Sequence, residues 1–104
     1  MKDKLLAVID EIISLLKSCN LEDKARWFQE RADQIKISER GTKDYLVELE
    51  KVRKVIAGMG SFSDLPMYPK KDSNISEEEA SQRQWDLAAR LGDLIEEELE
   101  KCGH

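Results

Sequence analysis

The apolar residues of this chain recur at steps of three and four, and this spacing restricts the fold more than any other feature. In the first stretch, residues 3–19, such residues form a wide stripe. Its members are Leu5, Leu6, Val8, Ile9, Ile12, Ile13, Leu15, Leu16 and Cys19. Positions three and four apart share one face of an α-helix, so the stretch predicts an amphipathic helix that is the most buried of the fold.

Three further stretches show the same periodicity, at about residues 21–35, 42–57 and 76–102. No segment alternates apolar and polar residues as a half-buried strand does, and no internal repeat is present. The connections between the first three stretches are short, which favours antiparallel neighbours. The sequence therefore predicts one all-α domain over residues 1–104, an antiparallel four-helix bundle.

Polar residues and glycines mark the expected helix ends. Asn20 fits both the stop of the first helix and the N-cap of the second, and Thr42 fits the N-cap of the third. Ser76 and Glu79 have the spacing of a capping box at the start of the last helix. Gly58 is well placed to end the third helix in a left-handed conformation.

The connection over residues 58–75 is far longer than usual for a helical bundle. It carries apolar side chains, namely Met59, Phe62, Leu65, Met67 and Tyr68. Residues 61–64 have capping-box spacing, which predicts one helical turn. The segment lacks the Gly-Lys-Ser/Thr ending of a phosphate loop and the second glycine of a nucleophile elbow. We expect a structural turn that packs against the helices, with a partner-binding element as the alternative.

The inventory of reactive side chains argues against an enzyme. His104 is the only histidine, and we expect a residue at the end of the sequence to be poorly held, which argues against Ser-His-Asp, Cys-His and zinc sites. Cys19 and Cys102 are too few and too far apart for a disulfide framework, so two free thiols are expected. We predict no catalytic residues and no cofactor.

One enzymatic alternative stays open. Helical nucleotide hydrolases hold magnesium with paired carboxylates, and Glu30-x-x-Asp33 and Glu97-x-x-Glu100 have a suitable spacing. Such pairs arise by chance in an acidic chain, and Glu97 is expected to face solvent.

The charge of the chain is concentrated at its end. The net charge is −5, yet residues 76–104 alone hold three basic and nine acidic side chains, a balance of −6. This argues against a nucleic-acid partner, because phosphate recognition needs a basic face. Five carboxylates fall opposite the apolar stripe of the last helix, and we call them the carboxylate face: Asp86, Asp93, Glu96, Glu97 and Glu100. Two interpretations are open: the face is in contact with solvent only, or it binds a cationic partner.

The two tryptophans are candidate interface anchors. Trp85 precedes the small residues Ala88, Ala89 and Gly92, which would leave room for its ring in the core. A core position is therefore favoured for Trp85, with an exposed anchor as the alternative. Trp27 sits at the edge of the apolar stripe of its helix, where either role fits.

No apolar run approaches the length of a membrane span, and no membrane partner is expected. Asp10 and Glu11 interrupt the first apolar stretch, and no small-residue cleavage site follows it, so it does not resemble a signal peptide. A cytoplasmic location is expected.

Residues 58–65, GMGSFSDL, carry a resemblance. They resemble the Gly-Gly-Met-Gly-Ser-Phe-Asn-Asp-Leu-like motif of a family of small, uncharacterised bacterial helical proteins, in which a final amphipathic helix follows. The chain departs at Ala57, where that motif has glycine, and at Ser63, where it often has asparagine. Proteins of this kind are similar in size and acidity to immunity proteins of bacterial toxin systems, including contact-dependent inhibition. The resemblance implies binding to a cognate toxin, often a basic nuclease.

The leading hypothesis is thus a non-enzymatic immunity protein that neutralises a basic toxin through the carboxylate face and the long connection. The expected partner-binding residues are Asp64, Tyr68, Asp86, Asp93, Glu96, Glu97 and Glu100, with Trp27 or Trp85 as an aromatic anchor. The alternatives are the magnesium-dependent hydrolase and a self-associating structural bundle. Neutralisation of the carboxylates by lysines and arginines of the same chain would count against the leading hypothesis.

Overall fold

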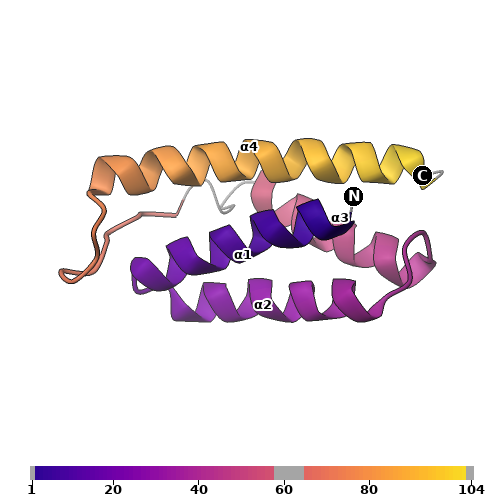
Figure 1. Cartoon of the computed structure of the whole chain (residues 1–104), viewed down its shortest axis with the longest axis horizontal. Coiled ribbons are helices and arrows are strands. Elements are labelled where there is room, and N and C mark those ends of the chain that lie inside the picture. The colour runs from indigo at the N-terminus through magenta and orange to yellow at the C-terminus, as the bar shows by residue number, and fades with distance from the viewer. Residues whose placement is uncertain (1, 58–64, 103–104) are drawn as a thin grey trace.

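A computed structural model of the chain describes residues 2–57 and 65–102. It contains four helices: α1 (Lys2–Ser18), α2 (Glu22–Ile37), α3 (Lys43–Ala57) and α4 (Glu77–Lys101) (Figure 1). No strand occurs in these two described ranges. The all-α prediction is confirmed, and each expected stretch coincides with a helix to within about two residues.

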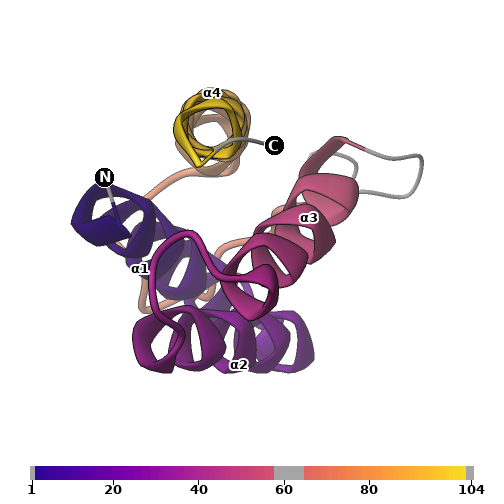
Figure 2. The ribbon, with the colours of Figure 1, turned by 90° about the vertical axis from the view of Figure 1, so that its right-hand side faces the viewer.

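Successive helices run antiparallel, and each packs against two others. The contacts run from α1 to α2, α2 to α3, α3 to α4 and α4 back to α1, so the four helices form a closed ring around the core (Figure 2). The bundle measures 44 × 22 × 21 Å. This confirms the antiparallel four-helix bundle, and it leaves one long side of each helix facing outward.

Helix α1 contributes most densely to the core. Seven of its 17 residues are buried, against four of 16 in α2 and seven of 25 in α4. Its wide stripe packs against both α2 and α4. The largest fully buried side chains from the other helices include Phe28, Tyr45 and Leu91. Burial of these apolar surfaces is the main force that holds the bundle together.

Two of the three expected N-caps are confirmed. The Tyr45 amide donates to Thr42 Oγ1 at 3.4 Å, and the Glu79 amide donates to Ser76 Oγ at 3.1 Å. Both bonds satisfy amides that have no partner within their own helix. These caps fix where α3 and α4 begin.

The prediction of Asn20 as the N-cap of α2 was wrong, although Asn20 does end α1. Its φ of 61° places it in the left-handed region, and the Leu21 amide donates to the Leu16 carbonyl at 2.9 Å, as in a Schellman motif. A left-handed residue cannot also take the extended backbone of an N-cap. Leu21 fills that position instead, and it makes no side-chain capping bond.

The described part of the long connection packs against the helices. Met67 is 4% exposed, and Leu65 is half-buried against the core. Gln84 Nε2 donates to the Leu65 carbonyl at 2.8 Å, and the Lys70 amide donates to the Ser18 carbonyl at 2.8 Å. These contacts attach residues 65–75 to α1 and α4. The glycine cap at residue 58 and the helical turn expected at 61–64 lie outside the described residues.

Candidate partner-binding face

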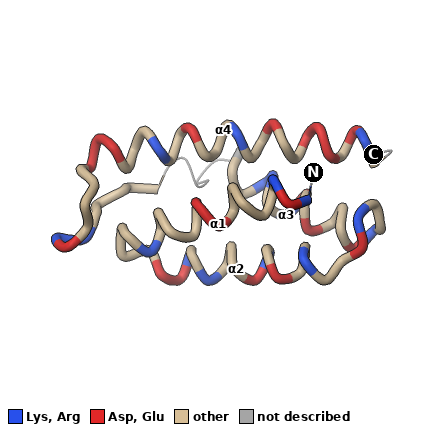
Figure 3. Tube along the Cα trace, viewed as in Figure 1, with Lys and Arg blue, Asp and Glu red and all other residues tan. Residues whose placement is uncertain are grey.

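The carboxylate face lies on the outer side of α4, opposite its buried stripe. All five of its members are exposed: Asp86, Asp93, Glu96, Glu97 and Glu100. Figure 3 shows the acidic positions along α4, with few basic positions between them. The helix places these residues within about 100° of arc, since steps of three, four and seven residues return to the same side.

In the described part of the chain, lysines and arginines form ion pairs with only two of the five carboxylates. Arg90 Nη1 lies 3.7 Å from Asp86 and also 3.7 Å from Glu11 on α1, and Lys101 Nζ lies 3.0 Å from Glu97. In the part of the chain that the structure describes, Asp93, Glu96 and Glu100 have no ion pair. Neutralisation by the chain itself is therefore incomplete, and three adjacent negative charges remain.

The prediction of Trp85 as a core residue was wrong, because Trp85 is 64% exposed. The preceding residue, Gln84, takes the inward position and is 3% exposed. A residue one step further along a helix is turned by about 100°, which brings the indole to the outer flank of α4. The small residue Gly92 leaves room for α3 and not for the Trp85 ring, since a Cβ at this position would lie 3.7 Å from Ile56 Cδ1.

Trp85 lies beside the carboxylate face. Trp85, Ala89 and Glu96 follow one another at steps of four and seven, so they share one edge of α4. At 1.5 Å per residue, the unpaired carboxylates lie further along α4, from about 12 Å beyond Trp85 for Asp93 to about 22 Å for Glu100. A partner that contacts both the indole and these carboxylates would therefore lie along the helix.

The other aromatic candidates are not part of this face. Trp27 is half-buried on α2, where its ring stacks edge-on against Phe28 at 5.1 Å and lies 5.6 Å from the Arg31 guanidinium carbon. Helices α2 and α4 do not contact each other within the described ranges. Tyr68, on the connection, is 63% exposed. Asp64 lies outside the described residues.

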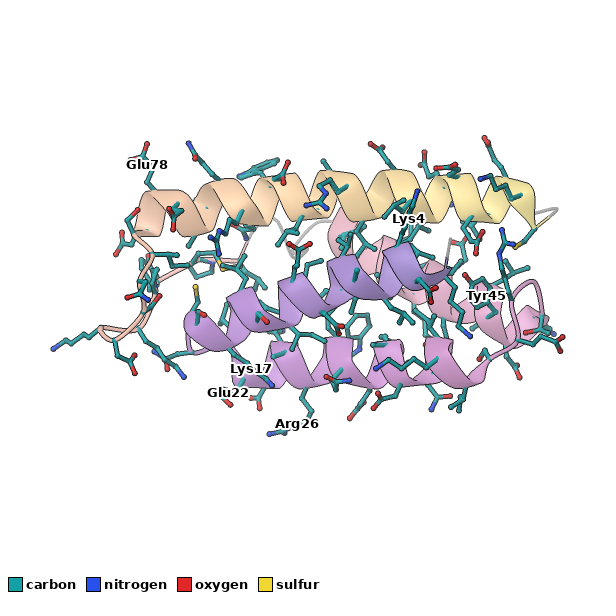
Figure 4. All side chains as sticks on the ribbon, viewed as in Figure 1. Lys4, Lys17, Glu22, Arg26, Tyr45 and Glu78 are labelled. Carbon is teal, nitrogen blue, oxygen red and sulfur yellow. The ribbon has the colours of Figure 1, made fainter. Side chains whose placement is uncertain are left out.

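Sequence reasoning missed a buried ionic cluster at one end of the bundle. Glu98 of α4 is fully buried and accepts hydrogen bonds from Arg40 Nε at 2.8 Å and Arg40 Nη2 at 2.7 Å. It also accepts one from the Tyr45 hydroxyl at 2.5 Å. Figure 4 places Tyr45 at the end of the bundle where α4 ends. The cluster connects the α2–α3 loop and the start of α3 to the last turns of α4.

The signal for Glu98 was present in the helical register. Glu98 lies seven residues after Leu91 and three after Ile95, both fully buried, so it falls within the apolar stripe rather than on the carboxylate face. Hydrogen bonding to Arg40 holds the pKa of Glu98 below its usual range, with the Tyr45 hydroxyl acting in the same direction against burial. Burial and the adjacent carboxylate raise the pKa of Tyr45, so the phenol stays protonated and donates.

A second missed pair joins α2 to α3. Glu48 is 8% exposed, and its carboxylate lies 3.2 Å from Arg31 Nη1 and accepts a hydrogen bond from Lys51 Nζ at 3.3 Å. The carboxylate thus ties the two helices together. Both buried glutamates act in structure and are unavailable to a partner.

The carboxylate pairs proposed for magnesium do not converge. Glu30 and Asp33 lie on α2, whereas Glu97 and Glu100 lie on α4, and these helices make no contact within the described ranges. Lys101 already pairs with Glu97. The described residues contain no group of three or more histidine, cysteine, aspartate or glutamate side chains arranged to hold a metal ion. Cys19 and Cys102 are free thiols, as expected.

A groove of about 810 Å³ runs beside the carboxylate face, between α1, α4 and the turn before α4. Its charged lining residues are Asp10, Glu11, Asp72, Arg83, Asp86 and Arg90. Asp86 and Arg90 therefore border both the groove and the face. The face thus continues from a convex helix surface into a polar hollow.

Comparisons of the chain with known protein families, with curated proteins and with solved structures found no match. Among the described helices, none combines the length and apolar character that crossing a bilayer requires.

Proposed function

We propose that this chain is a non-enzymatic immunity-type protein, which binds a cognate basic toxin and neutralises it through the carboxylate face of α4 and the 58–75 connection. The observation that carries the proposal is the set of three carboxylates, Asp93, Glu96 and Glu100, that the described part of the chain leaves unpaired on the same helix that exposes Trp85.

An unpaired acidic cluster has a cost that a cationic partner would remove. Asp93 and Glu96 are three residues apart and Glu96 and Glu100 are four apart, so the like charges are neighbours on the helix surface and repel. A basic surface that docks on α4 would convert this repulsion into attraction. It would also raise the rate of encounter, because long-range charge steers association.

Exposed aromatic side chains give the proposed interface its affinity. Trp85 and Tyr68 are each more than three-fifths exposed, and both residue types are enriched among the few side chains that dominate binding energy. In this proposal the indole inserts between aliphatic parts of the toxin surface while the carboxylates pair with its lysines and arginines. Asp64 and the GMGSFSDL segment extend the contact along the connection.

The family resemblance of GMGSFSDL supports the same proposal by analogy. It leads to a specific biological expectation, that the toxin is encoded beside the gene for this chain and is a nuclease active in the cytoplasm. The protein would then act in that compartment by blocking the toxin's active site, without a cofactor and without binding nucleic acid itself.

The direct test is calorimetric titration of the purified chain with the neighbouring toxin, alongside an assay of the toxin's activity. We expect micromolar or tighter binding and loss of toxin activity. The double reversal Asp93→Lys/Glu96→Lys is expected to weaken binding about 10- to 100-fold, since both charges meet cations at the interface. Trp85→Ala is expected to weaken binding about 10-fold or more.

A matched control uses exposed carboxylates away from α4. Glu30→Lys/Asp33→Lys changes the net charge by the same amount, and both residues lie on α2, which does not contact α4 in the described ranges. This variant is expected to bind almost as tightly as the parent. Equal loss in both double variants, or no binding by the parent chain at micromolar concentration, would overturn the proposal.

The magnesium-dependent hydrolase has weaker support, because its two carboxylate pairs lie on helices that do not touch in the described ranges. It predicts release of phosphate or pyrophosphate from nucleotides, abolished by Glu97→Gln.

A further inference from the structure

A second outward-facing helix surface has the opposite character to the carboxylate face. On α3, five residues line a shallow hollow of about 640 Å³ together with Glu50, and we call them the lysine face: Lys43, Leu46, Val47, Lys51 and Lys54. Val47 is 42% exposed. A neighbouring hollow of about 510 Å³ shares Val47 and Lys51 and reaches Ile37 at the end of α2, which is 77% exposed.

The lysine face is cationic in an otherwise acidic molecule. Lys51 donates to Glu48 at 3.3 Å, and Arg53 donates to Glu50 at 3.3 Å. Within the described ranges, Lys43 and Lys54 take part in no ion pair. The face therefore presents two uncompensated cations around an apolar centre of Val47 and half-buried Leu46.

We propose that the lysine face of one copy of this chain docks on the carboxylate face of a second copy. Each face lacks what the other offers: Lys43 and Lys54 lack anions, while Asp93, Glu96 and Glu100 lack cations. Each also exposes an apolar residue, Val47 on α3 and Trp85 on α4.

The spacing along the two helices permits this pairing. Val47 and Lys54 are seven residues apart, roughly 10 Å along the axis of α3, and Trp85 and Asp93 are eight apart, roughly 12 Å along α4. When Trp85 lies over Val47 and the two helices run in the same direction, Asp93 comes level with Lys54. This register brings one apolar pair and one ion pair together, while Lys43 lies level with Ser81 and Glu96 lies level with the end of α3.

Charge decides which faces can meet. Two lysine faces brought together would oppose lysines to lysines, and two carboxylate faces would oppose carboxylates to carboxylates. Only the unlike pair gives attraction, and a two-fold axis between copies can form this contact twice because α3 and α4 are neighbours. A contact one helix wide falls in the small size class of weak, reversible interfaces. Association is therefore concentration-dependent and weakened by salt.

Sedimentation velocity on the whole chain tests the proposal. We expect the weight-average sedimentation coefficient to rise with protein concentration at low salt and to return to the monomer value at high salt. Lys43→Glu/Lys54→Glu and Asp93→Lys/Glu96→Lys should each stay monomeric when alone. An equimolar mixture of these two variants should associate again, because each acidic face then meets a basic one. The four-fold variant that carries both reversals should self-associate like the parent.

The control for net charge is Lys24→Glu/Lys71→Glu, which alters two exposed lysines outside both faces and should associate like the parent. Circular dichroism of every variant verifies folding, and all substituted side chains are exposed. A parent chain that stays monomeric at every concentration at low salt would overturn the proposal. So would a lysine-face variant that still associates, or a mixture that does not.

Self-association and toxin binding compete for the same carboxylate face, whereas the lysine face is no part of the proposed toxin surface. Lys43→Glu/Lys54→Glu should therefore abolish self-association and bind the toxin without loss of affinity. This variant distinguishes failure of self-association from failure of toxin binding.

Discussion

The residue with the greatest consequence for the structure is Glu98. Its carboxylate is fully buried, and its bonds to Arg40 and Tyr45 bring three segments together. A buried charge that loses its partners is costly, because the protein interior solvates it poorly. Glu98 therefore fixes the position of the α2–α3 loop relative to α4.

Replacement of the charge should destabilise the fold more than removal of one hydrogen bond. We expect Glu98→Gln to lower the free energy of unfolding by about 1–3 kcal/mol, since the amide cannot accept two charge-assisted bonds from Arg40. Tyr45→Phe leaves both Arg40 bonds in place and should cost about 1 kcal/mol. Urea unfolding monitored by circular dichroism measures both. Equal stability of the parent and Glu98→Gln would contradict the tethering role.

The same cluster makes stability depend on acid. The pKa of Glu98 in the folded chain lies below its ordinary value of 4.5, so the unfolded chain binds the proton more readily. The stabilisation is complete above about pH 4.5 and is lost as the pH falls through the lower pKa of the folded state. Unfolding curves from pH 7 to pH 3 should show a smaller loss in Glu98→Gln than in the parent. Parallel curves would show that Glu98 titrates normally.

The residue scale was also where sequence reasoning was least reliable. Trp85 was expected in the core and no buried position was predicted for Glu98, because residue type was weighed above helical register. A glutamate seven residues after Leu91 is buried, whereas an indole one step after Gln84 is not. Neither Arg40 nor Tyr45 could be matched to Glu98 from the sequence, since 58 and 53 residues separate them along the chain.

Helix positions were predicted well, because they depend on local patterns. The stripes at steps of three and four gave all the described helices, and the hydroxyls of Thr42 and Ser76 marked two starts. Asn20 was ambiguous because asparagine suits both a left-handed stop and an N-cap. In the structure Asn20 is the left-handed stop, as the hydrogen bond from the Leu21 amide to the Leu16 carbonyl shows. Residue types alone do not predict this bond.

Substitution of two glycines by alanine should change the stability of the fold in opposite directions. Gly92 lies inside α4, where a Cβ would make ordinary contact with Ile56 Cδ1 at 3.7 Å, so Gly92→Ala should stabilise the fold by about 0.5–1 kcal/mol. Gly41 has a φ of +89° with open space around it, so Gly41→Ala should destabilise by about 1 kcal/mol through backbone strain alone. Thermal unfolding of both variants distinguishes packing from conformation. A destabilised Gly92→Ala would show that α3 packs against α4 too closely for a methyl group.

At the scale of the whole molecule, the sequence predicts how the helices are arranged but not which surface charges pair with one another. The contacts of α2 with α1 and α3 follow from the two short connections, and each helix of the ring leaves one outer side free. The sequence located the acidic excess in the last segment, but not which carboxylates the chain itself would neutralise. That outcome depends on Arg90 reaching both Asp86 and Glu11, and Glu11 belongs to another helix.

If the carboxylate face serves binding rather than stability, removal of the repulsion between its carboxylates should stabilise the fold. Lysine at position 96 would face Asp93 and Glu100 at three and four residues, replacing two repulsions by two attractions near a helix C-terminus. We therefore expect Glu96→Lys to raise the free energy of unfolding by about 0.4–1 kcal/mol while it weakens binding to a basic partner. Chemical unfolding and titration of one preparation measure both quantities. A loss of stability would indicate that Glu96 has a structural role.

The different surroundings of the two indoles provide a built-in optical signal. Trp85 stands in solvent on the outer flank of α4, whereas Trp27 is shielded by Phe28 and Arg31. Iodide should therefore quench the emission of Trp85 and leave that of Trp27 largely intact. A molecule that binds over Trp85 on the outer side of α4 will shift its emission towards the blue and protect it from iodide. Binding can therefore be measured by intrinsic fluorescence, without a label.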